Sequence, residues 1–488
     1  MFRKIRKAAA LLLAAGIIMG SNWTGVSAMA AEDAVALFPG VTPQMADPDY
    51  WAAVQELNEE GSAVKLRASS FTIDDLNQKI LQTPGCAMND LTKAAETFDA
   101  DKLMTGLAGS WESDRAYFRN SGAIYDINGN VADENFYNVI LANMINPAMT
   151  GTMHVIYGIC TERTDLRTCP TTQILTDDPA DVDFDYFQSS LLRVNEPVIV
   201  KTISTDGQWY LVDSTACSGW VRASDIALCR TKSEWEDAWK IPADQVLVVT
   251  GGKIYLEKSN HNVDISGRLL TMGTVLRIAK SWEYTGKVTN RSPIQNYAVW
   301  MPLRDKNGYY SKKVVLISQH SAVSVGYLPL TSQNVLRVAF SMLGDAYGWG
   351  AMLDSADCSS YIRDIYKCFG LELPRNTTWQ EAMPVVKCEM GKLPQNAEGD
   401  AVKAALLDTL PPGAVLYFPG HTMMYLGKVD GNYYVISSVS SVADPETGKY
   451  LRVRSVVVNT LGMKRMSGKT WMNCLDMALI PYEGAAVQ

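Results

Sequence analysis

Residues 344–380 read GDAYGWGAMLDSADCSSYIRDIYKCFGLELPRNTTWQ, and Cys358 in this stretch stands at a predicted helix start. After Cys358, apolar residues recur at helical spacing as far as Phe369, and Gly370 closes the run. Unpaired N–H groups and the positive dipole end of a helix N-terminus favour a thiolate, and a nearby base lowers the thiol pKa further. This placement predicts that Cys358 is a nucleophile. The alternatives are a small buried hydrophobe or one half of a disulfide.

A histidine that follows a tight turn is the candidate base. His421 comes directly after Pro419-Gly420 and begins a predicted strand, residues 421–427. The Asp430-Gly431 dipeptide predicts a hairpin that pairs this strand with residues 433–438. Such a histidine is well placed to project into a cleft, although a structural or surface histidine fits the same pattern. The sequence gives no such context to the other histidines, His154, His261 and His320.

A third group normally orients the base and fixes its tautomer. On the second strand of the predicted hairpin the options are Ser437 and Ser438, which strand alternation places on opposite faces. A hydroxyl is a weaker partner for an imidazolium than a carboxylate is, and either serine could equally face solvent. We take Ser437 as the predicted third catalytic residue, with Ser438 as the alternative.

The N-terminal part of the chain predicts mostly helices. Residues 31–150 carry helix start signals at Asp47-Pro48 and at Thr72, which is followed three residues later by Asp75. This region contains no group of residues typical of a catalytic site. We therefore expect it to be a helical support or cover.

The patterns change twice further along the chain. Residues 151–235 and 236–330 contain short apolar runs separated by turn signals such as Asp206-Gly207, which is typical of small antiparallel barrels. Residues 331–488 begin with a helix and continue as helices followed by strands, which predicts an α+β domain. The chain is therefore expected to be multidomain.

The first residues have the pattern of an export signal. Residues 1–30 combine a basic start, a short apolar run and small residues at the cleavage position. We expect a protein exported to the periplasm, the cell wall or the extracellular space. The alternative is an uncleaved signal anchor, but the apolar run is short for a membrane span, so we expect no stable membrane insertion after cleavage.

The composition argues against several classes of function. The 488 residues carry a net charge of −8, which gives no electrostatic basis for binding nucleic acid. The nine cysteines include no C-x-x-C spacing and the four histidines no H-E-x-x-H motif, so neither a zinc site nor a cofactor is indicated. Disulfides are permitted outside the cytosol, but an odd number of cysteines leaves at least one thiol unpaired.

Taken together, these residues resemble the NlpC/P60 family of cysteine peptidases over residues 326–480. The matching blocks, in the usual order, are Tyr347-Gly348-Trp349-Gly350, Asp357-Cys358-Ser359-Ser360, Pro374-Arg375-Asn376-Thr377 with Gln380, and Gly420-His421. The resemblance implies a papain-like α+β fold for residues 331–488. The two predicted barrels look like the bacterial SH3 domains of one subgroup, and residues 31–150 are similar to its N-terminal stabilising region.

The resemblance also implies a reaction, the hydrolysis of the bond between γ-D-glutamyl and an L-diamino acid in peptidoglycan stem peptides. In the multi-barrel subgroup the first SH3 domain helps to close the site over a free N-terminal L-alanine, which favours released peptides over intact wall. Asp357 and Ser359 would line the substrate pocket. Tyr347 would assist the oxyanion site, and Thr377 would lie near the glutamyl carboxylate.

The sequence departs from the family pattern at two places. Ser437 stands where the family usually has His or another polar group, and Gly350-Ala351 replaces the usual paired glycines. The first departure supports a competing hypothesis, a non-catalytic wall-binding protein with a degenerate peptidase domain. A third hypothesis is an acyltransferase that uses the same thioester chemistry. Under the peptidase hypothesis we expect a monomer that acts on peptidoglycan-derived peptides.

Overall fold

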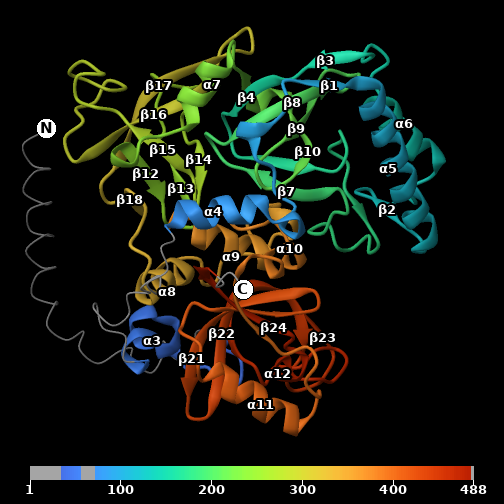
Figure 1. The fold of residues 1–488 in the computed structure, drawn as a ribbon, viewed down its shortest axis with the longest axis vertical. Helices are drawn as coiled ribbons and strands as arrows, with labels where there is room; N and C mark the ends of the chain where they lie inside the picture. The colour runs from blue at the N-terminus through green and yellow to red at the C-terminus, as the bar shows by residue number, and fades with distance from the viewer. Residues whose placement is uncertain (1–34, 56–71, 485–488) are drawn as a thin grey trace, which may run out of the picture.

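The structure is a computed structural model that describes residues 35–55 and 72–484. The predicted export signal, residues 1–30, lies outside the described residues. Figure 1 shows two stacked parts, with two β-sheets in green and yellow at the top and the C-terminal domain in orange and red at the bottom. Across the described ranges, no helix has both the length and the apolar character needed to cross a membrane.

Within residues 35–55 and 72–155, the α-helices that precede the first large sheet are α3 (Pro48–Val54), α4 (Ile73–Gln82), α5 (Ala100–Asn120) and α6 (Glu134–Met144). Both predicted helix starts are confirmed. The Asp47 side chain caps α3 by accepting a hydrogen bond from the Asp49 N–H, and Thr72 and Asp75 form a capping box at α4. Short strand pairs connect this region to the first sheet: β1 (Thr97–Asp99) with β3 (Thr152–His154), and β2 (Tyr125–Asp126) with β6 (Leu175–Thr176).

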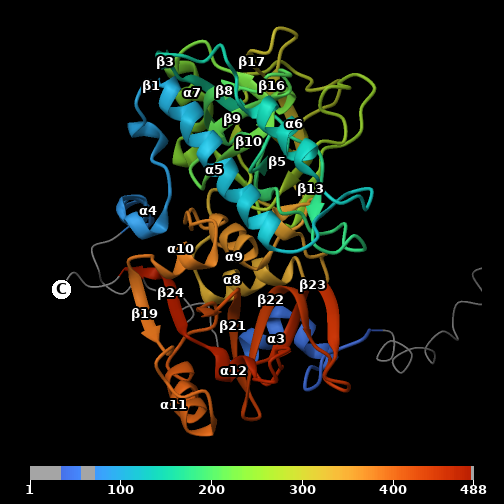
Figure 2. The same cartoon turned by 90° about the vertical axis from the view of Figure 1, so that its right-hand side faces the viewer.

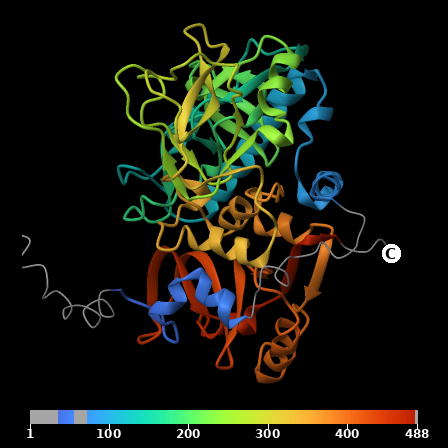
Figure 3. The same cartoon turned by 90° about the vertical axis from the view of Figure 1, so that its left-hand side faces the viewer.

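These N-terminal helices pack on both parts of the molecule. The ring of Trp51 in α3 lies 5.3 Å from the ring of Tyr434 in the C-terminal domain. Asn77 of α4 donates a hydrogen bond to the carbonyl of Gly370 (2.8 Å), whereas Trp111 of α5 is buried against the first sheet. Figure 3 shows the two helices in the darker blues, α3 against the C-terminal domain and α4 at the junction. The N-terminal region therefore braces both parts.

The first sheet has seven antiparallel strands in the order β11-β4-β8-β9-β10-β5-β7. The bounds are β4 (Ile156–Cys160), β5 (Thr164–Arg167), β7 (Gln188–Leu192), β8 (Pro197–Ile203), β9 (Trp209–Asp213), β10 (Ser218–Arg222) and β11 (Ile226–Leu228). The predicted turn at Asp206-Gly207 joins β8 to β9, and Gly207 has a φ of +72°. The strand β7 is at one edge and faces the C-terminal domain.

The second sheet has five antiparallel strands in the order β17-β16-β15-β12-β18. The bounds are β12 (Val246–Val249), β15 (Val275–Ile278), β16 (Asn296–Arg304), β17 (Tyr310–Ser318) and β18 (Val323–Val325), and a separate pair consists of β13 (Lys253–Tyr255) and β14 (Leu269–Thr271). Helix α7 (Lys232–Trp239) connects the two sheets. Trp235 of α7 donates to the carbonyl of Gly158 in β4 (3.1 Å), so α7 packs on the first sheet. The domain boundary at 235/236 stays a prediction.

The C-terminal domain combines five helices with one sheet. The helices are α8 (Ser332–Phe340), α9 (Cys358–Lys367), α10 (Thr377–Glu381), α11 (Ala397–Leu407) and α12 (Trp471–Cys474). The sheet is antiparallel in the order β19-β24-β20-β21-β22-β23, with bounds β19 (Val385–Glu389), β20 (Val415–Phe418), β21 (His421–Val429), β22 (Asn432–Ala443), β23 (Tyr450–Thr460) and β24 (Met477–Gly484). This arrangement is the mixed helix and sheet content that the sequence predicts.

The helix α9 lies between the C-terminal sheet and the two upper sheets. Figure 2 shows α8, α9 and α10 as a layer between them. The apolar face of α9, which includes Ile362 and Ile365, is buried in one core with Met424 of β21 and Ile436 of β22. Burial of these side chains fixes the helix on the sheet. The N-terminal end of α9 is thereby placed next to the start of β21.

Candidate active site

Cys358 is the first residue of α9, as predicted. The Asp357 carboxylate accepts a hydrogen bond from the Ser360 N–H (2.8 Å), and the Ser360 hydroxyl accepts one from the Asp357 N–H (2.9 Å). These two bonds form a capping box that fixes the helix start. Within the described residues the Cys358 N–H donates no hydrogen bond, as is usual for the first N–H groups of a helix.

A buried ion pair supports the residues on either side of Cys358. Arg375 Nη2 lies 2.6 Å from Asp357 Oδ2, and Arg375 Nη1 lies 3.0 Å from the Ser359 hydroxyl. Arg375 Nε donates to the carbonyl of Ser189 in β7 (3.1 Å). Burial opposes ionisation of Asp357, but the Arg375 guanidinium outweighs it and holds the pKa of Asp357 below its ordinary value. In this structure Asp357 and Ser359 therefore support the helix start.

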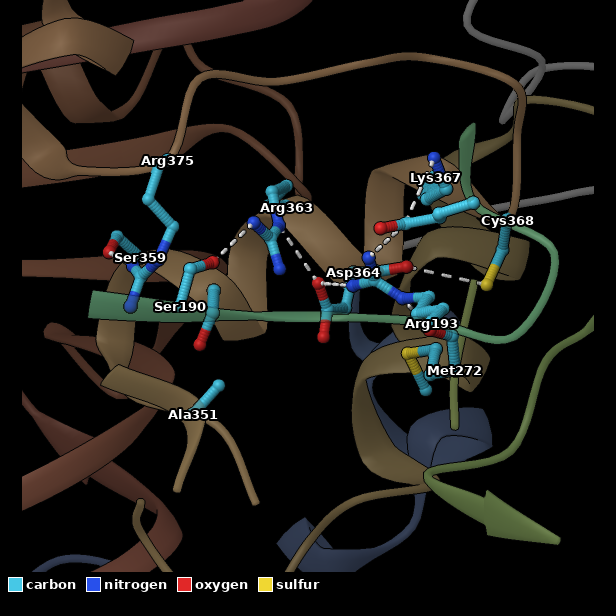
Figure 4. A network of polar contacts seen from close by, with 12 residues as sticks. Ser190, Arg193, Met272, Ala351, Ser359, Arg363, Asp364, Lys367, Cys368 and Arg375 are labelled. Carbon is cyan, nitrogen blue, oxygen red and sulfur yellow. Dashed lines mark hydrogen bonds and ion pairs between the residues drawn. The ribbon is translucent and has the colours of Figure 1, made fainter. Parts of the chain in front are cut away.

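A second charged network lies along the side of α9 that faces the upper sheets (Figure 4). Arg193, which is only 2% exposed, donates to the carbonyl of Met272 (2.8 Å) and pairs with Asp364 of α9. Arg363 bonds Asp364 (3.1 Å) and the hydroxyl of Ser190 in β7 (3.3 Å). The network joins α9 to β7 and its following loop and to the loop after β14, so the helix that carries Cys358 is held by two separate segments.

His421 is the first residue of β21 and pairs across a two-residue turn with Phe418. Its Nε2 lies 3.1 Å from the hydroxyl oxygen of Ser437, which is fully buried on β22. When Nδ1 is unprotonated, the Nε2–H donates to this hydroxyl. Ser438 lies on the opposite face and donates to the carbonyl of Ala356 (2.7 Å). Of the two serines, Ser437 is the one that contacts the histidine.

Two aromatic rings pack around His421. The ring of Phe418 lies 5.4 Å from the imidazole, and the ring of Trp471 lies 5.1 Å from it at an interplanar angle of 62°. Nothing in the sequence predicts that Trp471 packs on this histidine. The local signal is a capping box between Thr470 and Asn473, which predicts the start of α12 but not the ring contact with a histidine far away in the sequence.

Cys358 and His421 line one cavity of about 450 Å³, together with Tyr347. Both reactive side chains are partly exposed. Within the described part of the chain, no hydrogen bond joins the Cys358 thiol to the His421 ring. Asp357, Ser359 and Thr377 do not line this cavity, whereas the aromatic residues described above do. The two groups that the sequence predicts to react therefore share a cavity without being paired.

Burial reverses the ionisation that the sequence predicts. The helix start suggests a lowered thiol pKa, but burial raises the pKa of Cys358 to about 12, although the backbone N–H groups of Thr422 and Ser359 oppose this rise. Burial, together with the nearby Arg465 cation, lowers the pKa of His421 to about 3. Both shifts favour a neutral thiol and a neutral imidazole at rest, whereas the helix start by itself favours a thiolate.

Tyr347 is buried beside the cavity and has a free hydroxyl. Its N–H donates to the carbonyl of Arg454 (2.9 Å), and the Arg454 guanidinium lies 5.7 Å from its ring centroid. Among the described residues no hydrogen bond involves the Tyr347 hydroxyl, and burial raises its pKa, so it remains a protonated donor. A donor of this kind can stabilise negative charge that develops in the cavity.

The first sheet contacts the loop that follows Tyr347. Gln188 of β7 donates to the carbonyl of Gly350 (3.0 Å), and the ring of Phe184 lies 4.9 Å from the ring of Trp349. The Gly350 N–H in turn donates to the Asp357 carboxylate (3.1 Å). The loop thus links the first sheet directly to the cap of α9.

The departure at Gly350-Ala351 has a consequence for the backbone. Ala351 has a φ of +66°, a left-handed conformation that costs a residue with a Cβ atom about 1–2 kcal/mol. Arg163, which lies between β4 and β5 of the first sheet, offsets this cost. It donates to the Ala351 carbonyl and pairs with Asp354 (3.1 Å). The loop is therefore held in a strained conformation by contacts from outside the C-terminal domain.

Thr377 is the first residue of α10 and is half-buried. Asn376 caps this helix by accepting from the Trp379 N–H (2.9 Å). Gln380 is fully buried and donates to the carbonyl of Ser359 (3.0 Å). This segment supports the start of α9, and a contact of Thr377 with a glutamyl carboxylate stays a prediction.

In the part of the chain that the structure describes, the remaining cysteines and acidic residues form no second centre. Among residues 35–55 and 72–484, no group of three or more His, Cys, Asp or Glu side chains is arranged to hold a metal ion. All nine cysteines are free thiols, and Cys358 and Cys388 are the two that are partly exposed. Cys358 is therefore one of two thiols within reach of a reagent or substrate.

Comparison with known proteins gives the chain a family context. Residues 176–222 match the model of an SH3 domain (SH3b1 type), and residues 344–476 match the model of the NlpC/P60 family. A solved NlpC/P60 endopeptidase from Photobacterium damselae subsp. piscicida is 18% identical, with a TM-score of 0.67, and the match covers 89% of this chain and 97% of that one. An NlpC/P60 family protein from Bacillus cereus ATCC 10987 is 17% identical, with a TM-score of 0.42 over 66% of this chain and 98% of that one.

No curated protein sequence matches the chain. The likeness to the Photobacterium structure concerns the fold, and it extends over both upper sheets and the C-terminal domain. The family models cover the segments that contain β7 to β10 and the Cys358–His421 cavity. Residues 344–476 thus form an NlpC/P60 family domain, and an SH3 domain precedes it in the chain.

Proposed function

We propose that this protein is a cysteine endopeptidase that hydrolyses the γ-D-glutamyl–L-diamino acid bond of peptidoglycan stem peptides. The family domain supports a peptidoglycan-related hydrolase. The observation that carries the finer proposal is the shared cavity, in which a thiol at a helix start, an oriented imidazole and a free tyrosine hydroxyl meet.

The first half of the reaction transfers the acyl group to sulfur. Cys358 Sγ attacks the γ-glutamyl carbonyl carbon while its proton passes to His421, because both groups are neutral at rest. The new S–C bond gives a tetrahedral oxyanion, which the Cys358 N–H and the Tyr347 hydroxyl stabilise. The C–N bond then breaks, and the imidazolium gives its proton to the leaving amine of the diamino acid.

The second half releases the acyl group. His421 takes a proton from a water molecule, the resulting hydroxide attacks the thioester carbon, and the C–S bond breaks. The sulfur recovers the proton, so the products are a γ-glutamyl carboxylate and the free thiol. Throughout both halves Ser437 accepts a hydrogen bond from His421 Nε2 and holds Nδ1 as the nitrogen that exchanges protons. The proposed steps use this chain's own side chains and water.

The position of the first domain supports a preference for released stem peptides with a free N-terminal L-alanine. Gln188 and Phe184 contact the loop that follows Tyr347, so this part of the first SH3-type region lies close to the cavity. We further propose that both upper sheets are SH3-like barrels and that the N-terminal helices are a stabilising region. We also propose that the protein acts outside the cytoplasm and as a monomer. SH3 and NlpC/P60 domains are typical of secreted or periplasmic proteins that act on the cell wall.

A product assay tests the proposal. The purified protein is incubated with L-Ala-γ-D-Glu-diaminopimelate, and the dipeptide and free diaminopimelate are measured by chromatography with mass detection. We expect the wild type to release both products and Cys358→Ala to release none. Equal rates for the two proteins would rule out the assignment of Cys358. Absence of cleavage by the wild type would favour the wall-binding hypothesis, and transfer of the dipeptide to an added amine would favour the acyltransferase.

A further inference from the structure

The charge distribution in the cavity points to a feature of the substrate. Among the described residues that line the cavity, Arg465 is the one that is charged at neutral pH, since Cys358 and His421 are both neutral. The other lining residues are aromatic, aliphatic or hydroxyl-bearing, or glycine, and none is acidic. The cavity therefore offers one positive charge with no carboxylate to neutralise it.

Arg465 is held at the cavity by the local backbone. Its N–H donates to the carbonyl of Lys469 (2.9 Å), and its carbonyl accepts from the N–H of Gly468 (2.8 Å), so a tight turn fixes the residue. Its guanidinium lies 4.8 Å from the ring centroid of Phe418. In the part of the chain that the structure describes, its side chain makes no ion pair and donates no hydrogen bond. Its donors are therefore available to a ligand.

Arg465 lies on the side of the cavity where the leaving residue must sit. The leaving amine receives its proton from His421, so the residue that carries this amine lies next to the imidazole. Phe418, which supports the guanidinium, is one of the two rings packed on His421. The positive charge of Arg465 also contributes to lowering the pKa of His421, as expected of a close neighbour.

We propose that Arg465 binds a free carboxylate of the leaving diamino acid and so selects substrates that carry one. This inference rests on the proposed function. A guanidinium presents a planar fork of N–H donors that matches a carboxylate, and the pair is stronger than a neutral hydrogen bond. The carboxylate has two possible sources, the α-carboxylate of a peptide that ends at the diamino acid and the distal carboxylate of diaminopimelate. A lysine side chain carries an ammonium group instead, which Arg465 repels.

The test uses three peptides that differ in the leaving residue. The first is L-Ala-γ-D-Glu-L-Lys with a free α-carboxylate, the second is its C-terminal amide, and the third is L-Ala-γ-D-Glu-diaminopimelate amidated at the α-carboxylate alone. Each is assayed with wild type, Arg465→Gln and Lys464→Gln. Lys464 is the matched control, because it is an exposed cation one residue away that does not line the cavity.

We expect Arg465→Gln to lower kcat/KM about ten- to a hundredfold more on a peptide whose carboxylate contacts the guanidinium than on the lysine amide, whose change reports the altered pKa of His421 alone. The peptide that responds identifies which carboxylate is bound. Lys464→Gln should change none of the three, and Arg465→Lys should recover part of the loss. Equal losses on all three peptides would overturn the inference, because they would mean a general disturbance of the site.

A binding measurement separates failure of this inference from failure of the proposed function. Calorimetric titration of the peptides into Cys358→Ala, with and without Arg465→Gln, needs no turnover. If Cys358→Ala binds a carboxylate peptide more tightly than the amide, and the double variant does not, the carboxylate site is supported even when the wild type cleaves nothing. Equal affinity for acid and amide, or no binding of any peptide, would overturn it. Melting curves of each variant show that the fold is kept.

Discussion

Replacing Ser437 with alanine should slow the reaction without abolishing it. The Ser437 hydroxyl lies 3.1 Å from His421 Nε2, and the imidazole becomes a cation when it takes the thiol proton. A neutral hydrogen bond contributes about 0.5–1.5 kcal/mol and one to a charged group about 1.5–3 kcal/mol. The difference between the two, about 1–1.5 kcal/mol, lowers the activation free energy, because the imidazole is neutral at rest and charged in the transition state. It corresponds to a fall of about five- to tenfold in kcat/KM.

The matched control is the neighbouring serine on the same strand. Ser438 is also fully buried, but it lies on the opposite face and donates to the carbonyl of Ala356. The assay is kcat/KM on L-Ala-γ-D-Glu-diaminopimelate between pH 5 and 9 for wild type, Ser437→Ala and Ser438→Ala, with melting curves for all three. We expect both variants to lose a similar amount of stability, and Ser437→Ala to lose more activity.

Two results would show that Ser437 does not stabilise the charged form of His421. Wild-type kcat/KM in Ser437→Ala would mean that the hydroxyl does not act on the imidazole. Equal losses of activity in Ser437→Ala and Ser438→Ala would mean that the effect comes from general damage to β22. The expected loss is far smaller than the roughly 10⁴-fold loss that follows removal of a carboxylate orienter, because a hydroxyl carries no charge.

Three further predictions concern other parts of the site. Arg375→Gln should lower the free energy of unfolding of the C-terminal domain by about 3–5 kcal/mol, because it leaves the buried Asp357 carboxylate unpaired. Calorimetry at pH 7 measures this, and a fall in melting temperature of less than about 1 °C would contradict it. The rate at which iodoacetamide alkylates Cys358 should keep rising above pH 9, because burial raises the pKa of this thiol to about 12. A rate that reaches a plateau below pH 8, followed in the peptide that contains Cys358, would contradict this. Gln188→Ala removes the bond to the Gly350 carbonyl together with the buried bonds of Gln188 to Ser190 and Arg167, so it should lower kcat/KM several-fold and also lower the melting temperature; an unchanged kcat/KM would show that this contact does not hold the loop.

The elements that the sequence predicts well are those with local signals. The start of α9 depends on a capping box between Asp357 and Ser360, and the hairpin of β21 and β22 turns at Asp430-Gly431, where both residues have a positive φ. The start of α7 has a similar local signal, because Thr231 caps the helix by accepting a hydrogen bond from the Glu234 N–H (3.0 Å).

The features that the sequence could not predict depend on packing between distant segments. The position of Trp471 on the His421 ring and the position of Arg465 at the cavity both follow from the fold of the chain after β23. The balance that sets the pKa of Cys358 depends on such packing too. A helix N-terminus is visible in the sequence, whereas the burial that outweighs it becomes visible only when the surrounding elements are placed.

Mass spectrometry of the intact protein during turnover detects the acyl-enzyme that the proposed mechanism requires. The wild type is mixed with excess L-Ala-γ-D-Glu-diaminopimelate and quenched in acid, its intact mass is measured, and the modified residue is then mapped by peptide digestion. We expect an adduct with the mass of one L-Ala-γ-D-Glu acyl group on Cys358, absent from Cys358→Ala. Hydrolysis without this thioester, or an adduct on one of the other eight cysteines, would contradict it.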